Sequence, residues 1–340
     1  MLLRKGINLG GYLSQCPHTK EYYEDCILES DIGIISEMGF DHVRLPVDIE
    51  VLEDRLGNPN EECLSYVDRV IEWCSRRGLN VVLDLHKAFG YDFDRVEGNL
   101  LFHDETLKNH FVLTWQRLAR RYGKKENVVF ELLNEVVEEG VYEKWNELAG
   151  RTIAAIREIT DTLIIYGGVM WNSALTVDRL KKPEYENIMY TFHFYEPLLF
   201  THQRAYWVKN MPDCNIAYPG KMEAYKELSA ALGNQGETVL KSGCLNMGRE
   251  FMDEMIGTAV KAAEKNGVKL YCGEFGVIDR APLEDTARWF EDIAAVLKKY
   301  DIGFAIWNYT GKDFGLIDEH YAKISDRILR ALTWEKGKNS

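Results

Sequence analysis

The sequence predicts a (β/α)₈ barrel, formed by a single domain over residues 1–340. Short apolar runs bounded by turn residues alternate about eight times with helical patterns, and parallel strands buried on both faces have this character. Eight alternations favour a closed barrel over an open doubly wound sheet. The stretch Gly6-Ile7-Asn8-Leu9-Gly10-Gly11 lacks the Gly-x-Gly-x-x-Gly spacing, so a dinucleotide-binding sheet is not indicated.

Each expected strand is short and mostly apolar. We place the eight strands at Gly6–Leu9, His42–Leu45, Val81–Leu85, Val128–Leu133, Leu163–Tyr166, Ile188–Phe194, Lys269–Gly273 and Gly303–Trp307. Between them, apolar residues recur at the i, i+3, i+4, i+7 spacing of one helix face. The clearest patterns are Val67–Cys74, with Gly78 after it as a C-cap, Trp289–Tyr300 and Ile324–Leu332.

The interval from Glu196 to Arg249 is too long for an ordinary barrel loop, which takes a few residues. It contains the turn Pro219-Gly220 and a helical pattern from Met222 to Leu232. We therefore expect a small helical subdomain, residues 197–248, inserted after the sixth strand. Because it follows the carboxyl end of a strand, it would lie at the barrel mouth.

Composition and charge narrow the classes of partner. The chain of 340 residues is 46% hydrophobic and 28% charged, which is ordinary for a globular protein. Its 41 basic and 54 acidic residues give a net charge of −13. Because nucleic acids and anionic membranes attract basic patches, we expect neither as a partner. We expect a monomer that binds a neutral ligand.

Compartment and cofactors are inferred from the terminus and the cysteines. The amino terminus has only the apolar pair Leu2-Leu3 before Arg4-Lys5, which is too short for a signal-peptide core. We therefore expect a cytoplasmic protein, or a secreted one if a signal was trimmed. The seven cysteines are scattered without metal-ligand spacing. This pattern predicts reduced, mostly buried thiols, and we expect no metal or other cofactor.

Two carboxylates come directly after strand-like runs. Glu135 ends Leu132-Leu133-Asn134-Glu135 after the fourth expected strand, and Glu274 lies in Gly273-Glu274-Phe275-Gly276 at the end of the seventh. In a barrel of this kind, side chains at the carboxyl ends of strands line one mouth. Two facing carboxylates are what glycoside hydrolysis requires: an acid to protonate the leaving oxygen and a carboxylate to attack the anomeric carbon.

Seven motifs, each at a strand end, carry a family resemblance. They are Gly6-Ile7-Asn8-Leu9-Gly10-Gly11, Phe40-Asp41-His42-Val43-Arg44-Leu45-Pro46, Leu83-Asp84-Leu85-His86, Phe130-Glu131-Leu132-Leu133-Asn134-Glu135, Phe192-His193-Phe194-Tyr195, Tyr271-Cys272-Gly273-Glu274-Phe275-Gly276 and Ile306-Trp307-Asn308-Tyr309. Over most of its length the sequence resembles glycoside hydrolase family 5, within the clan of retaining (β/α)₈ glycosidases. Its likeness is greatest to the bacterial cellulase C type of endoglucanase, which also carries an insertion after strand six.

The resemblance implies catalytic roles for matching residues. Glu135 would be the acid/base and Glu274 the nucleophile. Arg44 would fix and ionise Glu274, because a guanidinium beside a buried carboxylate favours its charged form. Tyr195 would donate a hydrogen bond to Glu274, and His193 would contact Glu135 and tune its proton.

The resemblance also implies how sugar is bound. Asn134 would bind the sugar 2-hydroxyl, His86 would hold hydroxyls in the −1 subsite, and Trp307 would form its apolar floor. Many relatives have a second His after the third strand, where this chain has Lys87. An ammonium there could alter sugar contacts or lower the pKa of a neighbouring carboxylate.

The resemblance implies an endo-acting hydrolase of β-linked polysaccharide or oligosaccharide. Among the possible specificities it favours endo-β-1,4-glucanase or mixed-linkage glucanase. Other specificities in the family stay open: β-mannanase, xyloglucanase, exo-β-1,3-glucanase, or β-glucosidase on oligosaccharides. A sugar-binding barrel without turnover would need one carboxylate to be lost, and both are present. A phosphate-handling barrel would need an anion site late in the chain, where Gly311–Gly315 includes the acidic Asp313. Tyr206-Trp207 is either core of the insertion or a sugar platform.

Overall fold

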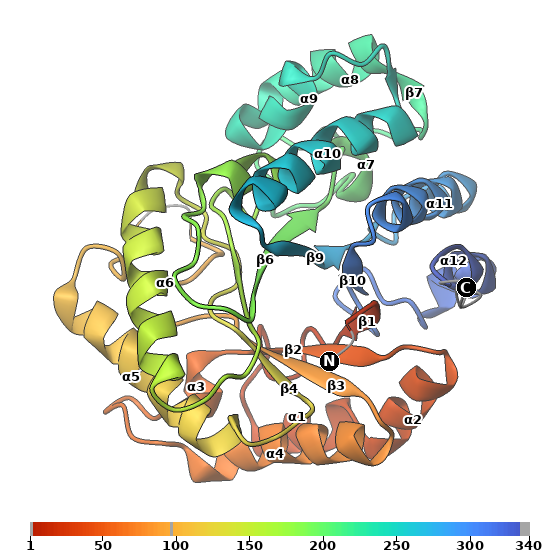
Figure 1. The fold of residues 1–340 in the computed structure, drawn as a ribbon. Coiled ribbons are helices and arrows are strands. Elements are labelled where there is room, and N and C mark those ends of the chain that lie inside the picture. The colour runs from red at the N-terminus through yellow and green to blue at the C-terminus, as the bar shows by residue number, and fades with distance from the viewer. Residues whose placement is uncertain (1–2, 96–97, 334–340) are drawn as a thin grey trace, which may run out of the picture.

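The computed structural model describes residues 3–95 and 98–333, and within them eight parallel strands close into a barrel (Figure 1). The strands are β1 (Lys5–Asn8), β2 (His42–Val47), β3 (Asn80–Leu85), β4 (Val128–Glu131), β5 (Ile164–Gly167), β6 (Ile188–Phe194), β9 (Lys269–Phe275) and β10 (Gly303–Ile306). β10 pairs with β1 and closes the barrel. The predicted fold class is confirmed, and each predicted strand overlaps an observed one.

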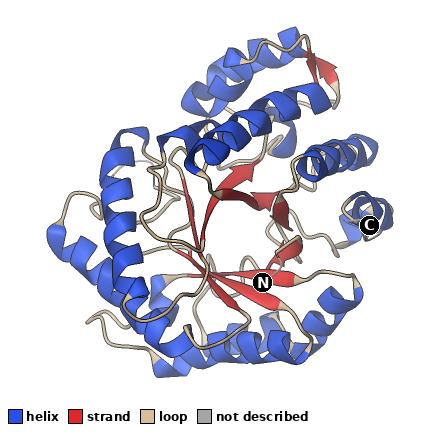
Figure 2. Cartoon of the chain, viewed as in Figure 1, coloured by secondary structure: helices blue, strands red, loops and turns tan. Residues whose placement is uncertain are grey.

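Helices surround the barrel (Figure 2). They are α1 (Lys20–Cys26), α2 (Glu29–Glu37), α3 (Ile49–Leu52), α4 (Glu61–Arg76), α5 (Glu105–Tyr122), α6 (Tyr142–Arg157), α10 (Arg249–Asn266), α11 (Leu283–Lys299) and α12 (Ser325–Ala331), with 3₁₀ helices η1 (Glu139–Val141), η2 (Ala174–Arg179) and η4 (Glu319–Tyr321). The three helical patterns fall in α4, α11 and α12. Gly78 follows α4 with a φ of 68°, so the predicted glycine cap is confirmed. Within the described residues, no helix has the length and apolar character needed to span a bilayer.

The stretch between β6 and α10 contains short elements of its own. They are α7 (Leu198–Thr201), β7 (Gly220–Lys221), α8 (Met222–Ser229), η3 (Ala230–Gly236), α9 (Glu237–Lys241) and β8 (Asn246–Met247). β7 and β8 pair antiparallel, apart from the barrel sheet. In Figure 1, α8, α9 and β7 lie beyond α10, on the side away from the barrel. The helical pattern from Met222 falls in α8 and η3, whereas the division of the chain at residues 197–248 stays a prediction.

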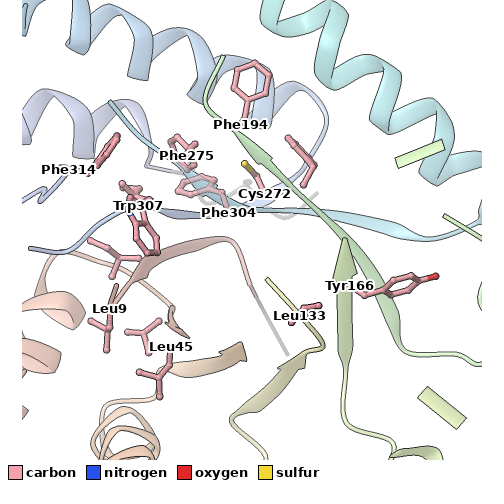
Figure 3. Packing of buried hydrophobic residues seen from close by; sticks show 14 of the residues in the cluster. Leu9, Leu45, Leu133, Tyr166, Phe194, Cys272, Phe275, Phe304, Trp307 and Phe314 are labelled. Carbon is pink, nitrogen blue, oxygen red and sulfur yellow. The ribbon is translucent and has the colours of Figure 1, made fainter. Parts of the chain in front are cut away.

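Two apolar clusters support the barrel. The larger one joins strands, helices and loops, and Figure 3 shows part of it, including Leu45, Phe194 and Phe275. The smaller one consists of Leu3, Val82, Val129, Ile165, Tyr271 and Ala305, most of which come from barrel strands. All seven cysteines lie within the described residues and are free. Only Cys74 and Cys272 are buried, four others are partly exposed and Cys214 is exposed, so the expectation of mostly buried thiols is wrong.

The smaller cluster lies on the inward face of the barrel. The strand register pairs Arg44 with Val82, and Val82 with Val129, so these side chains share one face of the sheet. Arg44 also contacts groups from β1, β4 and β9, which only the barrel interior allows. Glu131, two residues after Val129, shares that face. The interior therefore changes from apolar to charged toward the carboxyl ends of the strands.

Candidate active site

Arg44 on β2 is the centre of a buried polar network. Its Nη1 donates to Glu274 Oε1 at 2.7 Å and to Asn8 Oδ1 at 3.0 Å. Its Nη2 donates to Asn134 Oδ1 at 2.9 Å. One guanidinium therefore fixes the carboxylate of Glu274 and the side-chain amide of Asn134, which lie far apart in the sequence.

Two further carboxylates share this guanidinium. Nε and Nη2 donate to the two oxygens of Glu131 at 2.8 and 3.1 Å, and Asp84 Oδ2 lies 3.0 Å from Nη2. Burial raises the pKa of Glu131 to about 7, even though Arg44 opposes that shift. Glu131 is a site residue that was not predicted from the sequence. The available signal was a lone charged residue inside the apolar run Val128–Leu133, since a buried charge requires a partner.

A bulge in β9 turns Glu274 toward this network. After Phe192 the register skips one residue of β9, Gly273, so that His193 pairs with Glu274. One additional residue moves the side chains after it to the other face of the strand. Gly273 fits because a Cβ there would come within 2.9 Å of Thr191 Oγ1 and 3.1 Å of His193 Nε2. Nothing in the sequence pattern indicates this bulge.

Glu135 lies just beyond β4, near Glu274. One carboxylate oxygen from each, together with a ring nitrogen of His193, all lie within 4.8 Å of one another. His193 Nδ1 is 2.8 Å from Glu135 Oε1 and 3.6 Å from Glu274 Oε2. The Tyr195 hydroxyl donates to Glu274 Oε2 at 2.9 Å. The structure thus brings together the carboxylates and the neighbours expected for each.

The two carboxyl groups differ in their surroundings. Burial, and then the charge of Glu274, raises the pKa of Glu135 well above its ordinary value. Burial also raises the pKa of Glu274, but the Arg44 guanidinium and the Tyr195 hydroxyl oppose that shift. Burial, followed by the charge of Arg44, lowers the pKa of His193 well below its ordinary value, so the imidazole is neutral. Of the two acids, Glu135 is therefore the one whose surroundings favour the protonated form, and Glu274 is the one whose partners favour the ionised form.

His86 and Trp307 form a second side of the site. His86 Nδ1 is 2.7 Å from Asp84 Oδ2, which links it to Arg44. The His86 and Trp307 rings are nearly parallel, with 6.0 Å between centroids and 3° between planes. Trp307 fits against Gly10, where a Cβ would come within 2.4 Å of the indole ring. Both residues lie where the sequence placed them, and their contacts with sugar stay predictions.

Lys87 is held by acidic groups of the loop after β3. Its Nζ lies 2.7 Å from Asp94 Oδ2 and 2.9 Å from Asp92 Oδ1, and 5.2 Å from the centre of the Phe93 ring. Phe93 in turn contacts His86 edge-on, with 4.8 Å between the ring centroids. The ammonium is therefore neutralised locally and connects this loop to the side of the site that carries His86.

Exposed aromatic rings continue from the site onto the insertion. Tyr206 and Trp207 are 87% and 45% exposed, which excludes the interpretation that they form its core. Trp207 contacts Tyr206 at 4.9 Å and His202 at 6.3 Å between centroids, and His202 contacts Tyr195 at 5.0 Å. This series of rings leads from Glu274's partner Tyr195 to the surface. Their use as sugar platforms stays a prediction.

Two groups in the described residues bring possible metal ligands close together. One is Glu135, His193 and Glu274, and the other is His18, Asp48 and Glu50. The first is the carboxylate pair itself, and in the second His18 Nε2 is paired with Asp48 Oδ2 at 3.2 Å. Sequence spacing revealed neither group, because the members of each are brought together only by folding. The expectation of no metal or cofactor stays a prediction.

Known proteins resemble the chain over nearly its whole length. The sequence model of the cellulase family, glycosyl hydrolase family 5, matches residues 5–313. Endoglucanase C of Acetivibrio thermocellus is 40% identical over 340 residues, covering 98% of each chain. Cellodextrinase A of Ruminococcus flavefaciens is 39% identical over 301 residues, covering 88% of this chain and 83% of the relative. Among solved structures, endoglucanase Cel5A of Thermotoga maritima is similar with a TM-score of 0.77 and 28% identity over 97% of each chain. The resemblance in the motifs is confirmed, and the chain belongs to glycosyl hydrolase family 5, the cellulase family.

Proposed function

We propose that the chain is a retaining endo-acting β-glucanase whose substrate is β-1,4-glucan or mixed-linkage β-1,3/1,4-glucan. The observation that carries the mechanism is the approach of Glu135 and Glu274 carboxylate oxygens to within 4.8 Å. Retaining glycosidases place these groups about 5–5.5 Å apart, whereas inverting enzymes leave about 6.5–9.5 Å for a water molecule. The names of the endoglucanase relatives support a glucan substrate.

The first chemical step would use the two acids in opposite protonation states. Glu135, whose pKa is raised, would protonate the glycosidic oxygen as its bond to the anomeric carbon breaks. Glu274, held by Arg44 and Tyr195, would attack that carbon and form the glycosyl-enzyme ester. Glu135 would then take a proton from the water that hydrolyses the ester. Neutral His193 beside Glu135 would orient its carboxyl group.

Three polar or aromatic residues would bind the sugar in the −1 subsite. Asn134, fixed by Arg44, would contact the 2-hydroxyl, and His86, fixed by Asp84, would contact other hydroxyls. Trp307 would stack beneath the sugar, since an aromatic ring suits an apolar sugar face.

Hydrolysis of short cello-oligosaccharides is a second candidate, favoured by the similarity to a cellodextrinase. A product profile separates the two. The panel is barley mixed-linkage glucan, carboxymethylcellulose, glucomannan, xyloglucan, laminarin and cello-oligosaccharides. Mixed oligomers from the first two would support endo action, whereas activity on short oligomers alone would support the second candidate. The monomeric state, the absence of a nucleic-acid partner and the compartment stay predictions.

Substitutions test the assigned roles. Glu135→Gln should remove most turnover of glucan while substrate still binds, because the acid is lost and the shape is kept. Glu274→Ala should be rescued by azide with inversion of configuration. The exposed Glu143→Gln serves as a control and should leave activity unchanged. Full activity in Glu135→Gln would refute the acid/base role.

A further inference from the structure

The loop between β3 and α5 is bonded to the backbone that carries Glu135. The Tyr91 hydroxyl donates to the Glu135 carbonyl at 2.6 Å and accepts from the Val137 N–H at 2.8 Å. The Tyr91 ring is 2% exposed and meets Phe102 edge-on, with 5.4 Å between centroids. One buried hydroxyl therefore bridges the residues on either side of Val136.

The two hydrogen bonds of Tyr91 take the place of strand-to-strand hydrogen bonds in the segment after β4. β4 ends at Glu131, and the segment from residue 132 to residue 138 has no helix or strand. A buried carbonyl and a buried N–H each require a partner, and Tyr91 supplies both with one group. The place of the Glu135 backbone therefore depends on where the loop holds the Tyr91 ring.

The loop is built to hold that ring. Gly90, with a φ of 75°, permits the tight turn Ala88–Tyr91, in which the end residues exchange backbone hydrogen bonds of 3.1 and 2.9 Å. Asn99 accepts from the Asp92 N–H at 2.9 Å and donates to Glu138 Oε1 at 3.1 Å, a second link to the segment after Glu135.

We propose that Tyr91 is a positioning residue for the acid/base Glu135, an inference that rests on the proposed function. Glu135 must place its proton on the glycosidic oxygen and later accept one from water. A displacement of about 1 Å in a catalytic group can cost about 10²-fold in rate. Tyr91 acts through the backbone of Glu135, and its loss should affect proton transfer more than folding or sugar binding.

The test compares two leaving groups. Tyr91→Phe keeps the ring and removes the hydroxyl. For cellotetraose, whose sugar leaving group needs a proton, kcat/KM should fall about 10- to 100-fold. For 2,4-dinitrophenyl β-cellobioside, whose leaving group departs without protonation, kcat/KM should change less than threefold. kcat/KM is the quantity compared because it reports the first chemical step.

Two further variants keep the test decisive. Tyr166→Phe is a matched control, because Tyr166 is 3% exposed and its hydroxyl donates to the Lys181 carbonyl at 3.0 Å. It should lower the melting temperature without changing the ratio of the two kcat/KM values. Asn99→Ala, which loosens the same loop from Glu138, should show the selective pattern of Tyr91→Phe at smaller amplitude, and it serves as the test if Tyr91→Phe is insoluble.

Equal losses on both kinds of substrate, or no loss on either, would overturn the inference. Glu135→Ala measured in parallel separates this failure from failure of the proposed function. If Glu135→Ala is selective and Tyr91→Phe is not, only the role of Tyr91 is wrong. If Glu135→Ala is itself not selective, the acid role of Glu135 is wrong.

Discussion

Replacing Arg44 with lysine tests whether one guanidinium both stabilises the fold and sets the protonation state of Glu274, the proposed nucleophile. Arg44 contacts three carboxylates, those of Glu274, Glu131 and Asp84, at 2.7 to 3.1 Å. A lysine ammonium is a single point of charge and cannot span these acceptors. At least one buried carboxylate therefore loses its partner. Breaking a buried ion pair costs about 3–5 kcal/mol, which is a large fraction of the roughly 5–15 kcal/mol stability of a typical protein.

The same change should alter the pH dependence of catalysis. Arg44 opposes the rise in the pKa of Glu274 that burial causes. With that opposition weakened, Glu274 becomes protonated at a higher pH, so the acidic limb of the kcat/KM profile moves to higher pH. At neutral pH the displaced nucleophile should lower kcat/KM about 10²-fold. Urea unfolding and a pH series on a soluble cello-oligosaccharide measure both effects.

Arg121→Lys is the matched control. Arg121 also contacts two acids, Glu61 at 2.8 Å and Asp68 at 2.7 Å, but it lies partly exposed at the surface. Surface ion pairs typically contribute about 0.2–1 kcal/mol, so we expect a small change in unfolding and an unchanged pH profile. An unmoved acidic limb in Arg44→Lys would refute the argument that Arg44 keeps Glu274 ionised, even if the variant is less stable.

Three further substitutions test other parts of the structure. Burial raises the pKa of Glu196 from 4.5 to about 7, so its contribution to stability is present below pH 4.5 and is lost as the pH rises to 7. Glu196→Gln should remove this dependence and, in urea unfolding at pH 8, gain up to about 3 kcal/mol over the parent; no gain would contradict it. Gly10→Ala should displace Trp307 and lower kcat/KM on all glucans about tenfold or more, whereas Gly140→Ala, with open space around it, should not. Trp207→Ala should reduce activity on long glucan more than on cellotriose, and a uniform loss would argue against a sugar platform.

The arrival of Glu135 and Glu274 at one barrel mouth could be predicted from strand order, whereas the inward orientation of Glu274 also depends on the bulge in β9. Parallel strands in a closed barrel end at one mouth, so residues directly after two strands meet there wherever they stand in the chain. Arg44 could be predicted in the same way, because a charge between Val43 and Leu45 must find a buried partner. The shared mouth and the need of Arg44 for a buried partner follow from the apolar pattern alone, but the face of β9 on which Glu274 lies depends on the strand register.

Other features could not be predicted because they depend on register and loop shape. In the sequence Gly273 looks like an ordinary strand residue. Only the register between β6 and β9 shows that it is the additional residue of a bulge. Nothing in the sequence distinguishes Tyr91 from the other aromatic residues of its loop. Only the folded loop brings its hydroxyl to the Glu135 carbonyl. Glu131 was visible as a buried charge, but its bidentate contact with Arg44 requires the two strands to be aligned.

The same electrostatics suggest how Glu135 changes role between the two steps. After burial, the charge of Glu274 is the largest influence that raises the pKa of Glu135. In the proposed mechanism, Glu135 would therefore hold its proton and serve as an acid while Glu274 is ionised. Once Glu274 had formed the proposed ester with the sugar it would carry no charge, so the pKa of Glu135 would fall at the step where Glu135 must accept a proton from water. Arg44 stays in place throughout and lowers the pKa of Glu135, which favours the base form further. In this mechanism the reversal of the role of Glu135 would follow from the loss of one neighbouring charge and would need no movement of the surrounding residues.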